Sequence, residues 1–442
     1  MGAFEARLGL RDRTGGHPPL AAVDIGAGKI ACLIAAAPAD GPSERAIDIL
    51  GVGARALRHG GTCLTDPDTQ VRMLRVAADQ ALRMAGDAMP AFATAYAGGD
   101  LVTTRATGVV RVKKGIITAK EVSAAIAAAR VAADLENRRL LHCQPLGYSI
   151  DDNEPIADPR GLVGQELAVE VCLVHAPAEA VAAVEETIVR AGFPEPVFVV
   201  AGPFAAAHAV LSEEEREAGA VVIDFGESQV GVAVFEDGVL RHAETMTGAG
   251  ARLTLDLAAR LNTTFAVAER AKLAHGALSG DYDLGEALEV PTLGDDGRLE
   301  PGRALRGAIA EALLPRLEEI FERVGQRLAL AGYGAAPVGH GVALTGGVSL
   351  TPGIRQIAHR ILKRPVRLAQ PLNFAGFEHG SACATHALAT GVLRCGFSRL
   401  AAAAPQMARA RKAAGPAVVR EGAGVGGGAV VAQAVAWIKE NF

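Results

Sequence analysis

A short turn near the N-terminus combines an acidic residue, two glycines and a lysine in a pattern that can bind phosphate. The turn DIGAGK contains Asp24, Gly26, Gly28 and Lys29. Glycine turns expose backbone N–H groups, which can hold phosphate oxygens. A carboxylate at a strand end can hold Mg²⁺ through water, since this ion keeps several of its waters in proteins. Considered alone, the turn also fits an ordinary β-hairpin.

Two further glycine turns make the pattern more specific. Asp224 and Gly226 repeat the acidic-then-glycine turn in the second half of the chain, and Gly346 and Gly347 follow another apolar run. The two acidic-then-glycine turns form an internal repeat of a supersecondary unit, which implies two similar α/β halves. With the third turn, the order is strand–turn–strand, strand–turn–strand and strand–turn–helix, which is far more specific than any one turn.

The elements that must position these turns follow from the apolar pattern and from helix-start signals. Asp66 before Pro67 is a typical helix N-cap, and Thr118 with Glu121 forms a capping-box pattern. Apolar runs bounded by turn residues predict strands. We predict strands at 49–57, 167–176 and 196–201, helices at 67–86, 118–135, 177–192, 203–217 and 380–395, and a polar loop at 144–166.

The composition is that of a chain with a sizeable core and no general affinity for nucleic acid. Half of the 442 residues are hydrophobic, 21% are charged, and the net charge is −5. A mildly acidic protein is a poor partner for a polyanion. The six cysteines have no paired spacing, which predicts reduced thiols rather than disulfides or a zinc site. Because we find neither a signal-peptide pattern nor an apolar run of membrane-spanning length, we expect a cytoplasmic protein.

Several stretches of the sequence resemble a family of bacterial division proteins. Three glycine turns in this order are similar to those of the actin-like ATPase superfamily, which includes actin, hexokinase and the sugar kinases. Within it, the chain resembles the FtsA family over about residues 20–398 and again in its last residues. The stretches that carry the resemblance are CQPLGYSIDDNEPIADPRGLVGQELAVEV, VLSEEEREAGAVVIDFG, AERAKLAHG and LLPRLEEIFERV.

The resemblance implies an actin-like, two-lobed α/β ATPase fold with an inserted α+β subdomain and a C-terminal amphipathic helix. The inserted subdomain would mediate self-assembly. The implied parts are a loose N-terminus (1–16), a first lobe (17–91, 177–202 and 376–398), the insertion (92–176), a second lobe (203–375, with an outer helical part at 245–320), a flexible linker (399–428) and a membrane-targeting helix (429–442).

The resemblance also implies a site for ATP and Mg²⁺. Asp24 and Asp224 would hold Mg²⁺ through water, one from each phosphate loop. Glu269 and Lys272 would lie near the ribose and adenine, although a solvated ion pair on a helix also explains them. The implied nucleotide-binding residues are Asp24, Gly26, Gly28, Lys29, Asp224, Gly226, Glu269, Lys272, Gly346 and Gly347.

The second phosphate loop departs from the family pattern. Most such loops read DIGGGTTD, whereas this chain has DFGESQVG, in which Glu227 and Ser228 replace glycines and no threonine remains. A carboxylate beside a triphosphate repels it unless Mg²⁺ intervenes. We expect nucleotide binding with slow hydrolysis at most, and we identify no catalytic residue. His208 lies near the position that faces the catalytic water in actin-like folds, but a lone histidine on an Ala-rich helix is more often structural.

The C-terminus combines an apolar helix face with a basic tail. From residue 401 onward the chain carries five basic and two acidic residues. An apolar face with a basic tail is typical of an interfacial membrane anchor. The alternative is a helix that docks on its own domain. The residues predicted to face lipid are Val430, Val431, Val435, Trp437, Ile438 and Phe442.

The resemblance implies a division scaffold at the cytoplasmic face of the cell membrane. It would bind ATP, self-assemble into filaments, bind the C-terminal peptide of FtsZ and other division proteins, and tether the FtsZ ring at the division site. Two alternatives share the phosphate loops. A pilus-assembly ATPase would normally lack the terminal helix, and a sugar or small-acid kinase would need a catalytic Asp in the cleft.

Overall fold

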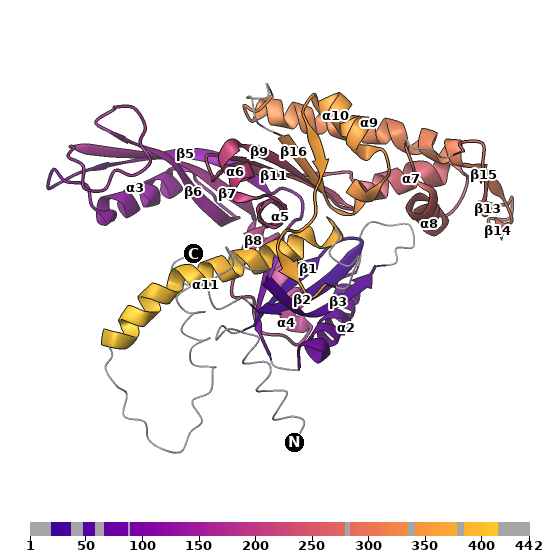
Figure 1. The fold of residues 1–442 in the computed structure, drawn as a ribbon, viewed down its shortest axis with the longest axis horizontal. Coiled ribbons are helices and arrows are strands. Elements are labelled where there is room, and N and C mark those ends of the chain that lie inside the picture. Colours follow the sequence, from indigo (N-terminus) through magenta and orange to yellow (C-terminus); the bar gives the residue numbers. More distant parts are fainter. Residues whose placement is uncertain are drawn as a thin grey trace, which may run out of the picture.

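Two sheets form the centre of the molecule, and the five strands of the second follow the same order as five of the six strands of the first (Figure 1). The computed structural model describes residues 19–36, 47–57, 66–86, 89–278, 283–334, 341–377 and 384–413, with side chains through residue 402. The orders are β18-β3-β2-β1-β4-β8 in the first sheet and β11-β10-β9-β16-β17 in the second. In each sheet, two consecutive antiparallel hairpins continue into parallel strands. This shared order is the repeat that the glycine turns predict.

The strands of both sheets are short apolar runs, as expected for sheets covered on both faces. Nearly every side chain of the first hairpin is buried. The first sheet contains β1 (Leu20–Ile25), β2 (Lys29–Ala36), β3 (Ile47–Ala56), β4 (Ala91–Tyr96), β8 (Val199–Ala201) and β18 (Phe374–Ala375). The second contains β9 (Ala220–Phe225), β10 (Gln229–Glu236), β11 (Val239–Thr247), β16 (Gly341–Thr345) and β17 (Val366–Leu368).

Helices cover both faces of the first sheet. On one face lie α2 (Pro67–Ala85) and α4 (Ala178–Arg190), and on the other lie α5 (Gly202–Val210) and α11 (Ala387–Ala413). Helix α2 begins at its predicted N-cap, where the Asp66 carboxylate accepts hydrogen bonds from the N–H groups of the first turn. These caps satisfy donors that have no partner within the helix.

A small α+β subdomain is inserted between β4 and α4. It consists of β5 (Val102–Arg111), α3 (Ala119–Ala132), β6 (Arg138–Ile150) and β7 (Glu166–Pro177), with strand order β5-β7-β6. Helix α3 packs on β5 and β7 around a core of its own. The two ends of the insertion meet, since Val102 and His175 are register partners. Figure 1 shows the insertion and the outer part of the second lobe at opposite ends of the molecule.

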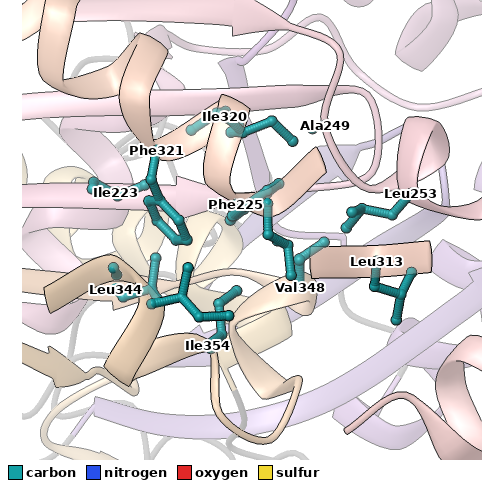
Figure 2. Close-up of a cluster of buried hydrophobic side chains, with 14 of the residues drawn as sticks. Ile223, Phe225, Ala249, Leu253, Leu313, Ile320, Phe321, Leu344, Val348 and Ile354 are labelled. Atoms are coloured by element: carbon teal, nitrogen blue, oxygen red, sulfur yellow. The ribbon is translucent and has the colours of Figure 1, made fainter. Parts of the chain in front are cut away.

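The outer part of the second lobe is mostly helical. It consists of α7 (Gly250–Arg260), α8 (Phe265–His275), two small sheets of β12 (Ala287–Glu289), β15 (Arg303–Leu305), β13 (Thr292–Leu293) and β14 (Leu299–Glu300), and α9 (Arg306–Leu330). The short helix η1 (Gly347–Leu350) and α10 (Ile354–Leu362) follow β16. Figure 2 shows the core that joins them, in which Phe225 packs edge-on against Phe321 and Val348 lies beside them. This core anchors the ends of two chain segments that carry glycine turns.

The structure differs from the sequence prediction in several elements. The helix predicted at 203–217 is two helices, because Ser212 makes a capping box with Glu215 and starts α6 (Glu213–Ala218). The first part of the loop predicted at 144–166 belongs to β6. Pro145 is tolerated there because β6 is an edge strand with a register shift beside this residue.

Three boundaries of the predicted parts also shift. β4 pairs with β1 in the first sheet, so the chain leaves that sheet after Tyr96 rather than at 92. β18 joins the first sheet beside β3 instead of the second lobe. Helix α11 continues to Ala413, past residue 399, where the linker was predicted to begin. Within the described part of the chain, the helices lack the combination of length and apolar character that a membrane span requires.

Candidate functional site

The first glycine turn closes the β1–β2 hairpin. The Gly26 N–H donates to the Lys29 carbonyl at 3.0 Å. Asp24 lies near the end of β1 and is buried, with 7% of its surface exposed. The Lys29 ammonium donates to the Thr385 carbonyl and lies 3.3 Å from His386 Nδ1. The loop is thereby joined to the segment that leads into α11.

The second glycine turn repeats this geometry in the second lobe. The Gly226 N–H donates to the Gln229 carbonyl at 3.0 Å, as Gly26 does in the first turn. The first residues of α7 donate hydrogen bonds to the backbone of this loop. The Gly250 N–H donates to the Gly226 carbonyl at 3.2 Å, and the Ala251 N–H donates to the Glu227 carbonyl at 2.7 Å. The turn is therefore fixed through its backbone.

The third turn approaches the second so closely that only glycine fits at its first position. Gly346 has φ +88°, and a Cβ atom there would lie 2.5 Å from Asp224 Oδ1 and 2.6 Å from the Phe225 nitrogen. The preceding residue, Thr345, pairs in register with Asp224. The adjacent Gly347 has more room, since the nearest atom to its Cβ position is Thr385 Cγ2 at 3.8 Å.

Glu269 and Lys272 form an ion pair that faces the cleft. Lys272 Nζ lies 2.7 Å from Glu269 Oε2 and donates to Thr254 Oγ1 at 2.7 Å and to the Gly250 carbonyl at 3.3 Å. The Thr254 hydroxyl in turn donates to the Glu269 carboxylate. The pair is tied to α7 and is therefore more than an ordinary solvated pair. No sequence motif marks Thr254, because it comes close only when α7 and α8 pack together.

All ten sequence-predicted site residues line one cavity of about 630 Å³ between the lobes. It is formed by the two hairpin turns, the turn after β16 and helix α8. Leu273 and Leu350 line it too and are 75% and 52% exposed, so they offer aliphatic surface to a flat ring. Other lining residues that the sequence did not single out are Gln70, Gly98, Thr245, Gly250 and Thr385.

The cavity carries a pair of acidic groups, Asp24 and Asp224, whose charges are only partly offset by the nearby Lys29. Burial raises the pKa of the Asp24 carboxyl, against an opposing effect of Lys29. The pKa of the Asp224 carboxyl is raised to about 7, first by burial and then by the Asp24 carboxylate, again opposed by Lys29. Groups that favour a bound proton in this way also attract a cation.

The residues present fit Mg²⁺. In the residues that the structure describes, no three His, Cys, Asp or Glu side chains converge to hold a metal ion directly. Mg²⁺ commonly binds through one or two carboxylates, its own waters and the phosphates of a substrate. Asp24 and Asp224 supply such carboxylates, one from each lobe.

His208 does not face the cleft. It packs against the rings of Phe204 and Phe235, with centroid distances of 4.3 and 5.7 Å. Burial lowers its pKa to about 3, with smaller contributions from nearby arginines. The structural explanation of this histidine is therefore the correct one. The residues predicted to face lipid, from Val430 to Phe442, lie outside the described residues.

Comparison with known proteins identifies the family. The family model "Cell division protein FtsA" matches residues 221–392, and "SHS2 domain inserted in FTSA" matches residues 98–175. The Cell division protein FtsA of Rhizobium meliloti (strain 1021) is 30% identical over 431 residues, which is 95% of this chain and 94% of that protein. This chain belongs to the FtsA family of cell division proteins.

A second relative agrees with this assignment. Cell division protein FtsA of Neisseria meningitidis serogroup B is 30% identical over 427 residues, which is 96% of this chain and 98% of that protein. Among solved structures, the PilM-PilN type IV pilus biogenesis complex is similar with a TM-score of 0.57 at 18% identity, covering 85% of this chain and 97% of that chain. At this identity the similarity concerns the fold alone, which is actin-like.

The position of the FtsA insertion agrees with the sheet topology. The matched SHS2 domain begins at residue 98, which lies after β4 leaves the first sheet and before β5 begins. The insertion predicted at 92–176 therefore begins earlier than the matched domain, because its first residues belong to β4 and complete the sheet of the first lobe.

Proposed function

We propose that this FtsA-family protein binds ATP with Mg²⁺ in the cleft between its lobes. The observation that carries the proposal is the convergence of all ten implied residues on one cavity, although they come from four separate segments of the chain. The glycine turns would hold phosphate oxygens through backbone N–H groups. Asp24 and Asp224 would hold Mg²⁺, which neutralises phosphate charge when bound.

The remaining groups would orient the rest of the nucleotide. The Lys272–Glu269 pair lies beside α7, where it can hydrogen-bond a ribose or a base. Leu273 and Leu350 would contact the adenine ring, because their aliphatic surface is exposed to the cavity. No described residue is assigned as a general base, so hydrolysis is slow in this proposal. A turnover of the order of 10 s⁻¹ or more would contradict a scaffold role.

Calorimetry with ATP and Mg²⁺ tests the cleft assignment. Asp24→Ala removes a carboxylate that would hold the ion, and we expect affinity to fall at least about tenfold. The matched control is Asp295→Ala, since Asp295 is exposed and far along the chain from the glycine turns. Equal affinities in all three proteins would refute the assignment.

The scaffold role in this proposal is to tether the FtsZ ring to the cytoplasmic face of the cell membrane. Membership of the FtsA family supports a division role over the kinase and pilus-assembly alternatives. The outer part of the second lobe would bind the C-terminal peptide of FtsZ, and the insertion would mediate self-assembly into filaments. Because its ends meet at Val102 and His175, the insertion can be replaced by a short Gly-Ser bridge. Filaments that persist on lipid after this replacement would refute its role.

Co-sedimentation with anionic liposomes tests the membrane tether. Removal of residues 429–442 should release the protein from lipid without unfolding it. Ile438→Asp should be more damaging than Trp437→Ala, since it places a charge on the apolar face. Trp437 is the single Trp of the chain, so its emission should shift to the blue when liposomes are added. An emission that is already blue-shifted and does not respond to lipid would mean that the helix docks on its own domain.

A further inference from the structure

Glu227 belongs to the second lobe, yet its carboxylate lies against the first glycine turn. A Cβ atom placed on Gly28 would lie 1.8 Å from Glu227 Oε2 and 2.9 Å from its Cδ. Only the absence of a side chain at Gly28 leaves room for this approach. Both residues line the cavity. The Glu227 side chain therefore spans from the second glycine turn to the first.

The backbone of the second loop directs this side chain across the cleft. The Glu227 carbonyl accepts a hydrogen bond from the Ala251 N–H at 2.7 Å, and the preceding Gly226 carbonyl accepts one from Gly250. Both donors lie at the start of α7, whose Leu253 is buried in the core of the second lobe. The position of the carboxylate is thus supported by an anchored loop.

A carboxylate and a phosphate can bind at the same kind of anion site. Each is an anionic acceptor for which a glycine turn with exposed N–H groups is a favourable site. We propose that Glu227 is an internal competitor of the nucleotide phosphates, which must displace its carboxylate from Gly28 before they can occupy the first loop. This inference rests on the proposed nucleotide function. It identifies Glu227 as the residue that makes ATP binding depend on Mg²⁺.

The displaced carboxylate would stay close to the phosphates. Asp24, Asp224 and the Lys272-paired Glu269 already line the same cavity, so Glu227 adds a fourth acidic group. In the absence of a divalent cation, this charge repels a triphosphate. Mg²⁺ bound with the phosphates would offset that repulsion, because its charge neutralises part of theirs. Glu227 should therefore weaken metal-free ATP much more than ATP with Mg²⁺.

Equilibrium binding of ATP to the full chain tests this inference, once with Mg²⁺ and once with EDTA. Glu227→Gly removes the side chain, and Glu227→Gln removes only the charge. In EDTA we expect Glu227→Gly to bind ATP at least about tenfold more tightly than wild type, and Glu227→Gln to show a smaller gain. With Mg²⁺ the gain of Glu227→Gly should fall to about threefold or less. The exposed Glu186 supplies the control variant Glu186→Gln.

The outcomes separate this inference from the proposed function. If all four proteins bind ATP equally in EDTA, or if Glu227→Gly binds more weakly than wild type, Glu227 is not a competitor. A gain of the same size with and without Mg²⁺ would overturn the metal dependence. If none of the four proteins binds ATP under either condition, the nucleotide function itself is wrong. Matched unfolding temperatures would establish that the variants are folded.

Discussion

The Thr245 hydroxyl donates a hydrogen bond to the Gly98 carbonyl at 2.6 Å, from β11 of the second lobe to the root of the insertion. The Thr245 hydroxyl oxygen also accepts a hydrogen bond from the Leu101 N–H at 3.3 Å, and the Thr245 N–H donates to the Leu101 carbonyl at 3.0 Å. Thr245 and Gly98 both line the cavity. The insertion is covalently part of the first lobe, but its root is bonded to the second lobe beside the cleft.

Thr245→Val tests this connection. Valine keeps the shape of threonine but leaves the Gly98 carbonyl and the Leu101 N–H without their side-chain partner. We expect the free energy of unfolding to fall by about 1–3 kcal/mol, because Leu101 is buried and its N–H loses its acceptor. Urea unfolding measures this change. Thr245→Ser keeps the hydroxyl and should stay within about 1 kcal/mol of wild type. An equal loss in both variants would assign the effect to packing.

Gly346 and Gly347 are equivalent in the sequence motif, but the structure separates them. Gly346 has φ +88° and little room beside Asp224, whereas the Cβ position of Gly347 makes an ordinary contact. Gly346→Ala should therefore lower ATP affinity at least about tenfold, because it moves the Asp224 carboxylate or the turn itself. Gly347→Ala should change affinity by less than about threefold. Calorimetry with ATP measures both affinities. An equal loss of affinity in the two variants would contradict this prediction.

A second pair of glycines gives opposite predictions for stability. A Cβ atom on Gly391 of α11 would lie 1.8 Å from the Ala205 carbonyl oxygen of α5, so Gly391→Ala forces two packed helices apart. We expect a loss of about 1–3 kcal/mol. Gly325 lies inside α9, where the nearest atom to a Cβ position is Leu362 Cδ2 at 3.7 Å. Gly325→Ala should stabilise the protein by about 0.5–1 kcal/mol through helix propensity.

These glycines show where sequence reasoning reaches its limit. The first hairpin, the N-cap at Asp66 and the capping box at Thr118 were predictable, because turn and cap signals depend on a few neighbouring residues. The grouping of the ten site residues followed from the internal repeat and the family resemblance. The approach of Glu227 to Gly28 has no local signal, because it depends on how two distant segments pack.

The same limit applies to His208 and to one error. The sequence favoured a structural role for His208, as the structure shows, but its contact with Phe204 and Phe235 is a property of the packed interior that no local pattern predicts. The second half of β6, from residue 144, is predicted as a loop because Pro145 and Gly147 favour turns locally. Pairing with β7 overrides this preference and absorbs the irregularity at a register shift.

Two partly buried histidines, His142 of the insertion and His208 of α5, predict how stability depends on pH. His142 Nε2 accepts a hydrogen bond from the Ala201 N–H at 2.9 Å, and the rings of His142 and His208 both pack against Phe204, with centroid distances of 4.1 and 4.3 Å. The pKa of each histidine is lowered to about 3, chiefly by burial. Both are therefore neutral in the folded protein at pH 7 and remain so well below it.

His142→Gln isolates one of these contributions. In the unfolded chain a histidine titrates near pH 6.5, so between about pH 6.5 and pH 3 the unfolded state binds a proton that the folded state does not. Stability due to each histidine is thus fully present above about pH 6.5 and is lost as pH falls, by about 2 kcal/mol at pH 5. Glutamine retains an acceptor for the Ala201 N–H but binds no proton. Urea unfolding at pH 7.5 and pH 5 should therefore show a loss that is smaller by about 2 kcal/mol in His142→Gln than in wild type. Equal losses in the two proteins would mean that His142 takes up its proton in the folded state, which its contact with Phe204 and its hydrogen bond from the Ala201 N–H oppose.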